Sequence, residues 1–136
     1  MWNDFTIAFG NKADETEARS ILASDFRFRG SLGPELRGPD GFIGYMRSVH
    51  DALGGFTCRI EEMIAVADRA AARMTFHGRH RGTFFGIEPS GQEIHWSGAA
   101  FFKTRDGRII ELLVLGDIEG IRQQLEPQRA AAIFRL

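Results

Sequence analysis

The hydrophobic positions of this chain change their spacing near residue 55. Before it they recur every three or four residues, which is the period of an amphipathic helix. After it they alternate with polar residues, which is the period of a strand with one buried face. Helices followed by a run of strands predict an α+β fold.

The first part of the chain predicts three helices. Residues 13–23 have acidic side chains in their first turn, where they favour a helix start. Another helix begins at Pro39, a residue that the first turn tolerates, and ends at Gly54. The apolar stripe of this helix is Phe42, Tyr45, Met46, Val49 and Leu53, and a short helix at the start of the chain has Trp2, Phe5 and Phe9.

Five segments predict strands. A short strand is expected at 25–29, where apolar residues alternate with arginine, and a loop follows over 30–38. The longer apolar alternations cover 56–66, 70–79, 94–102 and 109–115. Asp106-Gly107, between the last two runs, is a strong signal for a hairpin turn. We expect the strands to curl around the helices and to leave an apolar hollow between the two layers.

Residue parity predicts which side chains face this hollow. In the second long strand the even positions are apolar, Met74 and Phe76 among them, so the same parity places His80 inside and His77 outside. A bulge near Gly78 would reverse this assignment. Trp96 lies on the apolar side of the third long strand by the same argument.

Asp117 ends the last apolar run, and the spacing leaves two roles open for it. The carboxylate is either the N-cap of a helix that begins at Ile118 or a group that faces the hollow, where desolvation would raise its pKa and make it a useful base. A two-residue turn at Asp106-Gly107 sets Trp96 opposite Asp117, and a three-residue turn sets His95 there.

Composition predicts one domain over residues 1–136, because 136 residues is about the size of a single domain. Seventeen basic and eighteen acidic residues give a net charge of −1, which argues against a nucleic-acid partner. No apolar run approaches the ~20 residues of a membrane span, so no membrane partner is expected. With one cysteine and no visible secretory signal, the cytoplasm is the expected location.

Twelve Phe against one Tyr indicate a dry core or the wall of an apolar pocket. A metal site is not expected, because parity places His77 and His80 on opposite faces of the sheet. The expected partner is therefore a small apolar ligand, and no cofactor is predicted.

Three motifs keep a distinctive order and spacing. The first runs from Gly78 to Gly91 (GRHRGTFFGIEPSG), the second from Asp106 to Glu111 (DGRIIE) and the third from Asp117 to Leu125 (DIEGIRQQL). Weaker matches lie at 24–26 and 38–42. With these motifs the chain resembles the SnoaL-like polyketide cyclases, also called ester cyclases, of the nuclear transport factor two-like superfamily.

The resemblance implies a cone-shaped, curved and mostly antiparallel sheet around N-terminal helices, an apolar cavity, and a homodimer through the sheet. It maps Asp117 onto the general acid/base of an intramolecular aldol closure that uses no metal or organic cofactor, and His80 onto the strand histidine. Two positions depart from the family: Leu113 replaces a frequent Trp, and Arg29 falls near a frequent His. Both changes predict a different substrate from that of the antibiotic cyclases.

The chemistry expected of this site is proton transfer next to a carbonyl. Asp117 would remove and return the proton, and His80 would hold the oxygen. The predicted substrate-binding residues are Trp96, Phe76, Tyr45, Arg29, Met74 and Leu113. For the aromatic residues and His80 the alternative is ordinary core packing, and for Arg29 it is a solvated charge. A cyclase or isomerase, a non-catalytic ligand-binding domain and a hydrolase on the same scaffold all remain hypotheses.

Overall fold

The computed structural model describes residues 14–31 and 33–126. Within these ranges the chain forms three helices, α2 (Glu15–Ile21), α3 (Gly38–Ala52) and α4 (Ile118–Leu125). The predicted helix with Trp2, Phe5 and Phe9 lies outside the described residues. None of the described helices is long and apolar enough to cross a membrane.

Six strands form one mixed sheet in the order β2-β1-β6-β5-β4-β3. The pairing of β1 with β6 is parallel, and the other neighbours are antiparallel. The strands are β1 (Leu22–Arg29), β2 (Leu36–Arg37), β3 (Leu53–Val66), β4 (Arg69–His80), β5 (Glu93–Arg105) and β6 (Arg108–Gly116). The predicted α+β class is therefore confirmed, with a sheet that curves without closing.

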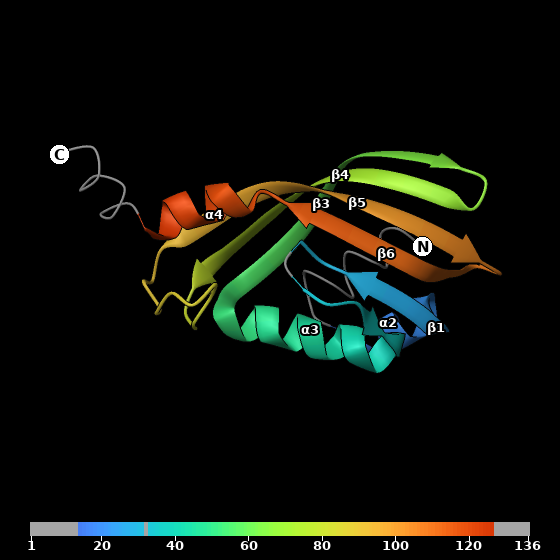
Figure 1. Ribbon diagram of the computed structural model, residues 1–136, viewed down its shortest axis with the longest axis horizontal. Coiled ribbons are helices and arrows are strands. Elements are labelled where there is room, and N and C mark those ends of the chain that lie inside the picture. Colours follow the sequence, from blue (N-terminus) through green and yellow to red (C-terminus); the bar gives the residue numbers. More distant parts are fainter. Residues whose placement is uncertain (1–13, 32, 127–136) are drawn as a thin grey trace.

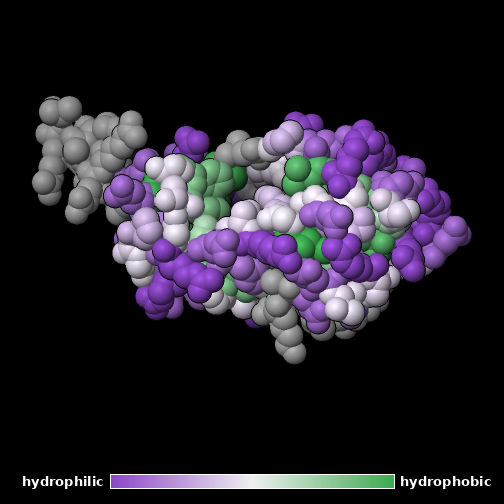
Figure 2. Space-filling view, turned by 90° about the horizontal axis from the view of Figure 1, so that it is seen from below, coloured by the Kyte–Doolittle hydropathy of each residue, from purple (hydrophilic) through white to green (hydrophobic). Residues whose placement is uncertain are grey.

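The helices α2 and α3 cover one face of the curved sheet, and α4 lies at one end of it (Figure 1). Five apolar residues of α3 are buried against the sheet at helical spacing, namely Phe42, Ile43, Met46, Val49 and Ala52. This burial, rather than local propensity, holds the helix in place. Seen from the α3 side, most of the surface is hydrophilic, with apolar surface toward the end where α4 lies and smaller apolar patches over the other half (Figure 2).

Helix α2 is shorter than the predicted 13–23 segment. The Asp14 carboxylate accepts the backbone N–H of Glu17 at 3.1 Å and starts the helix. The helix ends at Ile21 because Leu22 already pairs with Ile109 of β6. The strand predicted at 25–29 consequently begins three residues earlier, at Leu22.

The parity argument holds along β4 and β5. The even residues of β4 from Ala70 to His80 are all buried, and His77 is exposed. In β5, Trp96 lies on the same side as the buried Ile94 and Phe102. His80 is therefore inside, as predicted.

The β5–β6 hairpin corrects the expected register. Arg105 pairs with Arg108 across Asp106-Gly107, which confirms the two-residue turn. A bulge follows, because Thr104 pairs with Ile109 whereas Lys103 pairs with Glu111. The extra residue shifts the strands by one position.

This shift places a different residue beside Asp117. The backbone N–H of Asp117 donates to the carbonyl of Ser97 at 3.0 Å. The prediction that either Trp96 or His95 lies opposite Asp117 is wrong for this reason. A bulge inside a strand has no sequence signal as clear as the turn signal of Asp106-Gly107.

Candidate functional site

A pocket of about 400 Å³ lies between α3 and the concave face of the sheet. Its walls come from α3, α4, the sheet, residues 30–31 and 33–36, and the loop over residues 81–92. Pockets of this size hold small organic ligands. Among the described residues, no charged side chain lines the pocket.

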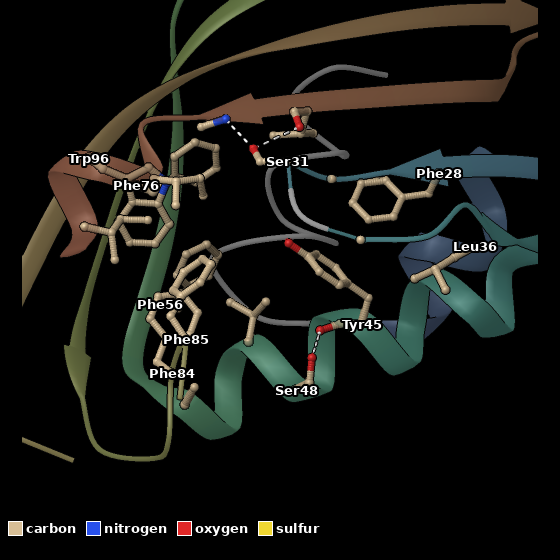
Figure 3. A pocket seen from close by; sticks show the side chains of 18 of the residues that line it. Phe28, Ser31, Leu36, Tyr45, Ser48, Phe56, Phe76, Phe84, Phe85 and Trp96 are labelled. Atoms are coloured by element: carbon tan, nitrogen blue, oxygen red, sulfur yellow. Dashed lines mark hydrogen bonds between the residues drawn. The ribbon is translucent and has the colours of Figure 1, made fainter. Parts of the chain in front are cut away.

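One side of the pocket is an aromatic wall built on adjacent strands. Phe76 and Trp96 are register partners on β4 and β5, and their rings stack with centroids 5.2 Å apart and planes 20° apart. Phe56 of β3 continues the stack, 6.1 Å from Phe76 with an interplanar angle of 16°. Phe84 and Phe85 of the 81–92 loop lie beside this group (Figure 3). The wall offers a flat ligand a broad apolar surface.

Gly98 makes room for the stacked rings. A methyl group built on it would lie 2.7 Å from the carbonyl oxygen of Leu115 and 3.0 Å from Cε2 of Phe76. Gly98 pairs with Gly116 of β6, whose own methyl group would lie 3.2 Å from Nε1 of Trp96. The two facing glycines thus leave space for the rings of Phe76 and Trp96.

Tyr45 of α3 faces the aromatic wall from the other side of the pocket (Figure 3). Its hydroxyl points into the pocket, and its ring packs on Phe28 with centroids 4.8 Å apart. Burial raises the pKa of Tyr45, so the phenol stays protonated at neutral pH. The pocket therefore contains a phenol that carries its proton, the form that can act as a hydrogen-bond donor.

Ser31 closes the pocket near β6. Its hydroxyl accepts the backbone N–H of Gly116 at 2.6 Å and lies 3.4 Å from the carbonyl oxygen of Val114 (Figure 3). These contacts tie the segment after β1 to the end of β6. Ser31 therefore holds the pocket wall, and its hydroxyl is already used in doing so.

His80 is fully buried and lies outside the pocket lining. Its Nδ1 is 3.2 Å from the backbone nitrogen of Ser90 and 2.9 Å from the Ser90 hydroxyl. Its Nε2 is 3.2 Å from the carbonyl oxygen of Ile87. Both ring nitrogens thus contact the 81–92 loop, so His80 would have to release a loop contact to hold a ligand oxygen.

Asp117 caps α4. Its Oδ1 accepts the backbone N–H of Gly120 at 2.9 Å, and the side chain is exposed. Its neighbours Gly116 and Ile118 line the pocket, whereas Asp117 itself does not. Of the two roles that the sequence left open, the structure shows the cap. The catalytic role of Asp117 stays a prediction.

The remaining predicted residues separate into two groups. Trp96, Phe76 and Tyr45 come together at the pocket, as just described. Met74 is a fully buried core residue that does not line it. Arg29 and Leu113 are register partners that border a second hollow on the opposite face of the sheet. Phe28 points to the pocket, so the next residue, Arg29, points away from it.

Sequence reasoning missed the pocket residues outside the long strands. Phe84 and Phe85 were not singled out, although two adjacent Phe in a loop rich in Gly, Pro and Ser are a signal for an apolar contact. Ser31, in the glycine-rich segment after β1, carries no such signal.

A cysteine nucleophile and a metal centre have little support in the described residues. Burial raises the pKa of the Cys58 thiol, so this thiol stays protonated and is a weak nucleophile. Within the part of the chain that the structure describes, no three His, Cys, Asp or Glu side chains gather in a way that would hold a metal ion.

The sequence matches the family model of the SnoaL-like polyketide cyclases over residues 1–125. No curated protein matches the chain. The fold is similar to that of TsrD from Streptomyces laurentii, with 25% identity, a TM-score of 0.82 and coverage of 92% of this chain and 91% of that one.

Two further solved structures share the fold. IdmH from Streptomyces antibioticus is 22% identical with a TM-score of 0.80, and the alignment covers 91% of this chain and 94% of IdmH. A protein from Catenulispora acidiphila, described as having a ketosteroid isomerase-like fold, is 12% identical with a TM-score of 0.78, over 91% of this chain and 90% of that one.

Proposed function

We propose that this chain, which belongs to the SnoaL-like polyketide cyclase family, binds a small apolar carbonyl compound of the polyketide type and promotes its ring closure. The observation that carries the proposal is the pocket of about 400 Å³, with stacked aromatic rings on one side and the Tyr45 hydroxyl on the other. The pocket would hold the compound folded, with its reacting oxygen at Tyr45.

Positioning is the main contribution expected of this pocket. Holding two reacting carbons of one flexible chain together removes much of the entropic barrier to bond formation. In an aldol closure the attacking carbon loses a proton and the carbonyl oxygen becomes an alkoxide that gains one. A protonated Tyr45 is suited to stabilise that oxygen by donating a hydrogen bond.

A second candidate is general acid–base catalysis by Asp117. Gly116 and Ile118, on either side of it in the chain, line the pocket, whereas the Asp117 carboxylate is turned to the backbone N–H of Gly120. To reach the ligand, the carboxylate would have to release the backbone N–H of Gly120. Loss of an N-cap contact costs about 1 kcal/mol, which a bound substrate could offset.

The proposal is tested with a linear oligo-β-ketone ester, whose aldol closure changes its retention time but not its mass. Liquid chromatography with mass spectrometry should show faster closure with the wild-type chain than in buffer. Tyr45→Phe should slow closure by about tenfold, the effect of losing one hydrogen bond to a developing charge. Ser20→Ala removes an exposed hydroxyl that bonds only within α2, and serves as the matched control.

The outcomes separate the candidate functions. Closure no faster than in buffer, with the ester still bound, would leave a non-catalytic ligand-binding domain. Oxygen from labelled water in the product would instead indicate the hydrolase hypothesis. Equal closure rates for the wild type and Tyr45→Phe would contradict the role given to the Tyr45 hydroxyl.

The open face of the sheet supports the expected homodimer. Phe101 and Leu115 on this face are 48% and 50% exposed. Phe101 pairs with Leu113, and Leu115 with Ala99, so the apolar side chains lie in adjacent rows. No described helix covers this face (Figure 1). We propose that a second copy of the chain packs on it.

A further inference from the structure

The 81–92 loop brings Phe84 and Phe85 to the pocket on a tight turn. Phe84 and Ile87 exchange both backbone hydrogen bonds, at 3.1 and 3.0 Å. Phe85 and Gly86 between them have positive φ angles of 52° and 74°. The Phe84 ring lies 6.2 Å from that of Trp96, so the position of this 84–87 turn sets one boundary of the pocket.

The first residues of the loop are anchored to the end of α3. The backbone N–H groups of Arg81 and Gly82 donate to the Ala52 carbonyl at 2.9 and 3.0 Å. The Arg81 guanidinium donates to the His50 carbonyl. These contacts satisfy carbonyls that the helix end leaves without an internal partner. They fix the start of the loop but not the 84–87 turn.

His80 holds the far side of the turn. A backbone N–H can only donate, so Nδ1 of His80 is the acceptor for the N–H of Ser90. The proton of the neutral ring is then on Nε2, which donates to the carbonyl of Ile87. Ile87 is the last residue of the 84–87 turn, so the ring ties the turn to the end of β4.

We propose that His80 is a positioning residue that sets the width of the pocket. By holding Ile87 and Ser90, it fixes the distance between the Phe84–Phe85 pair and the aromatic wall on β4 and β5. The size of ligand that fits is therefore decided by a buried ring that does not itself line the pocket. This inference rests on the proposed function only in requiring that the pocket bind a ligand.

The test uses alkyl phenyl ketones of increasing chain length, from acetophenone to decanophenone, as neutral probes. Trp2→Phe in every protein makes Trp96 the only tryptophan, so that its fluorescence reports binding at the pocket. His80→Ala should weaken binding of the best wild-type ketone by about tenfold and move the preference to longer chains. His80→Gln, which can donate to Ile87, should restore part of the wild-type preference.

A milder variant covers the case in which His80→Ala does not fold. Ser90→Ala removes the exposed hydroxyl that contacts Nδ1 of His80 and accepts the backbone N–H of Gln92 at 3.3 Å, and it should shift the preference in the same direction by a smaller factor. Ser97→Ala, an exposed position on β5, is its control. An unchanged chain-length preference in folded His80→Ala, or in Ser90→Ala if the former is unfolded, would overturn the inference.

Two ligand-free readouts separate this inference from the proposed function. Long-range ¹H–¹⁵N NMR of the wild type should show the Nε2–H tautomer of His80, and the Nδ1–H tautomer would contradict the assignment. Acrylamide should quench Trp96 more strongly in the Ser90→Ala and His80→Ala variants than in the wild type, and equal quenching would also count against it. If the wild type binds no ketone, the proposed function fails while these two measurements still decide the role of His80.

Discussion

The Asp117 carboxylate and the backbone N–H of Gly120 form a hydrogen bond of 2.9 Å that starts helix α4. The side chain that the family resemblance marks as an acid/base therefore has a structural partner. One carboxylate oxygen cannot cap the helix and remove a substrate proton from the same position. This competition makes Asp117 the position where stability and catalysis are best measured together.

Asp117→Asn and Asp117→Ala should separate the two roles. Asparagine is an N-cap as good as aspartate, so Asp117→Asn should leave the free energy of unfolding nearly unchanged, whereas Asp117→Ala should lower it by about 1 kcal/mol. Chemical denaturation measures both values. If positioning of the substrate is the main catalytic contribution, the rate of ring closure by Asp117→Asn stays within a few-fold of the wild-type rate. A loss of about 100-fold or more with intact binding would establish Asp117 as the acid/base.

Tyr45 should titrate above the ordinary pKa of about 10 for a tyrosine. Burial disfavours the phenolate, and because the chain has one Tyr its ultraviolet titration reports this residue alone. The stabilisation linked to the neutral phenol should be complete below the pKa of the unfolded chain and be lost as the pH rises through the higher folded value. Tyrosinate absorbance that rises at the same pH in native and denatured protein would contradict a buried hydroxyl.

Gly98→Ala should lower the free energy of unfolding by about 1–3 kcal/mol, because its methyl group would overlap Phe76 and the Leu115 carbonyl. Gly44→Ala is the matched control, since no atom lies within 4 Å of a methyl group at that exposed helix position. It should stabilise the protein by up to about 1 kcal/mol through helix propensity. Thermal denaturation measures both, and a neutral Gly98→Ala would show that the aromatic wall is less tightly packed than described.

Phe101→Glu should abolish the proposed dimer, because two charges would be buried where apolar rows meet. Sedimentation velocity at micromolar concentration should show a dimer for the wild type and a monomer for the variant. Ser20→Ala on α2 is the control, because the Ser20 hydroxyl bonds to the Glu17 carbonyl within that helix. A wild-type monomer would remove the dimer proposal and leave the pocket unaffected.

Much of the fold was predictable because hydrophobic spacing encodes it directly. The alternation in β4 placed His80 inside, and the turn at Asp106-Gly107 has the two residues that its backbone needs. The bulge at Ile110, between Ile109 and Glu111, was not predictable, since no residue there demands it. One extra residue exchanged Trp96 for Ser97 opposite Asp117.

The candidate site was predictable only where it lies on regular elements. Strand parity and helix spacing brought Trp96, Phe76 and Tyr45 to one pocket. The roles of side chains at element ends depend on local hydrogen bonds that spacing does not reveal. Asp117 is at such an end and caps a helix, and Arg29 is on the strand face opposite to the one expected.

The most direct test of the account is the carbonyl ¹³C NMR shift of a carbonyl-labelled alkyl phenyl ketone bound to the protein. If the Tyr45 hydroxyl donates to the carbonyl oxygen as proposed, the signal shifts downfield with the wild-type chain, and Tyr45→Phe loses that shift and binds more weakly. The same shift and affinity in both proteins, or no binding to either, would contradict it.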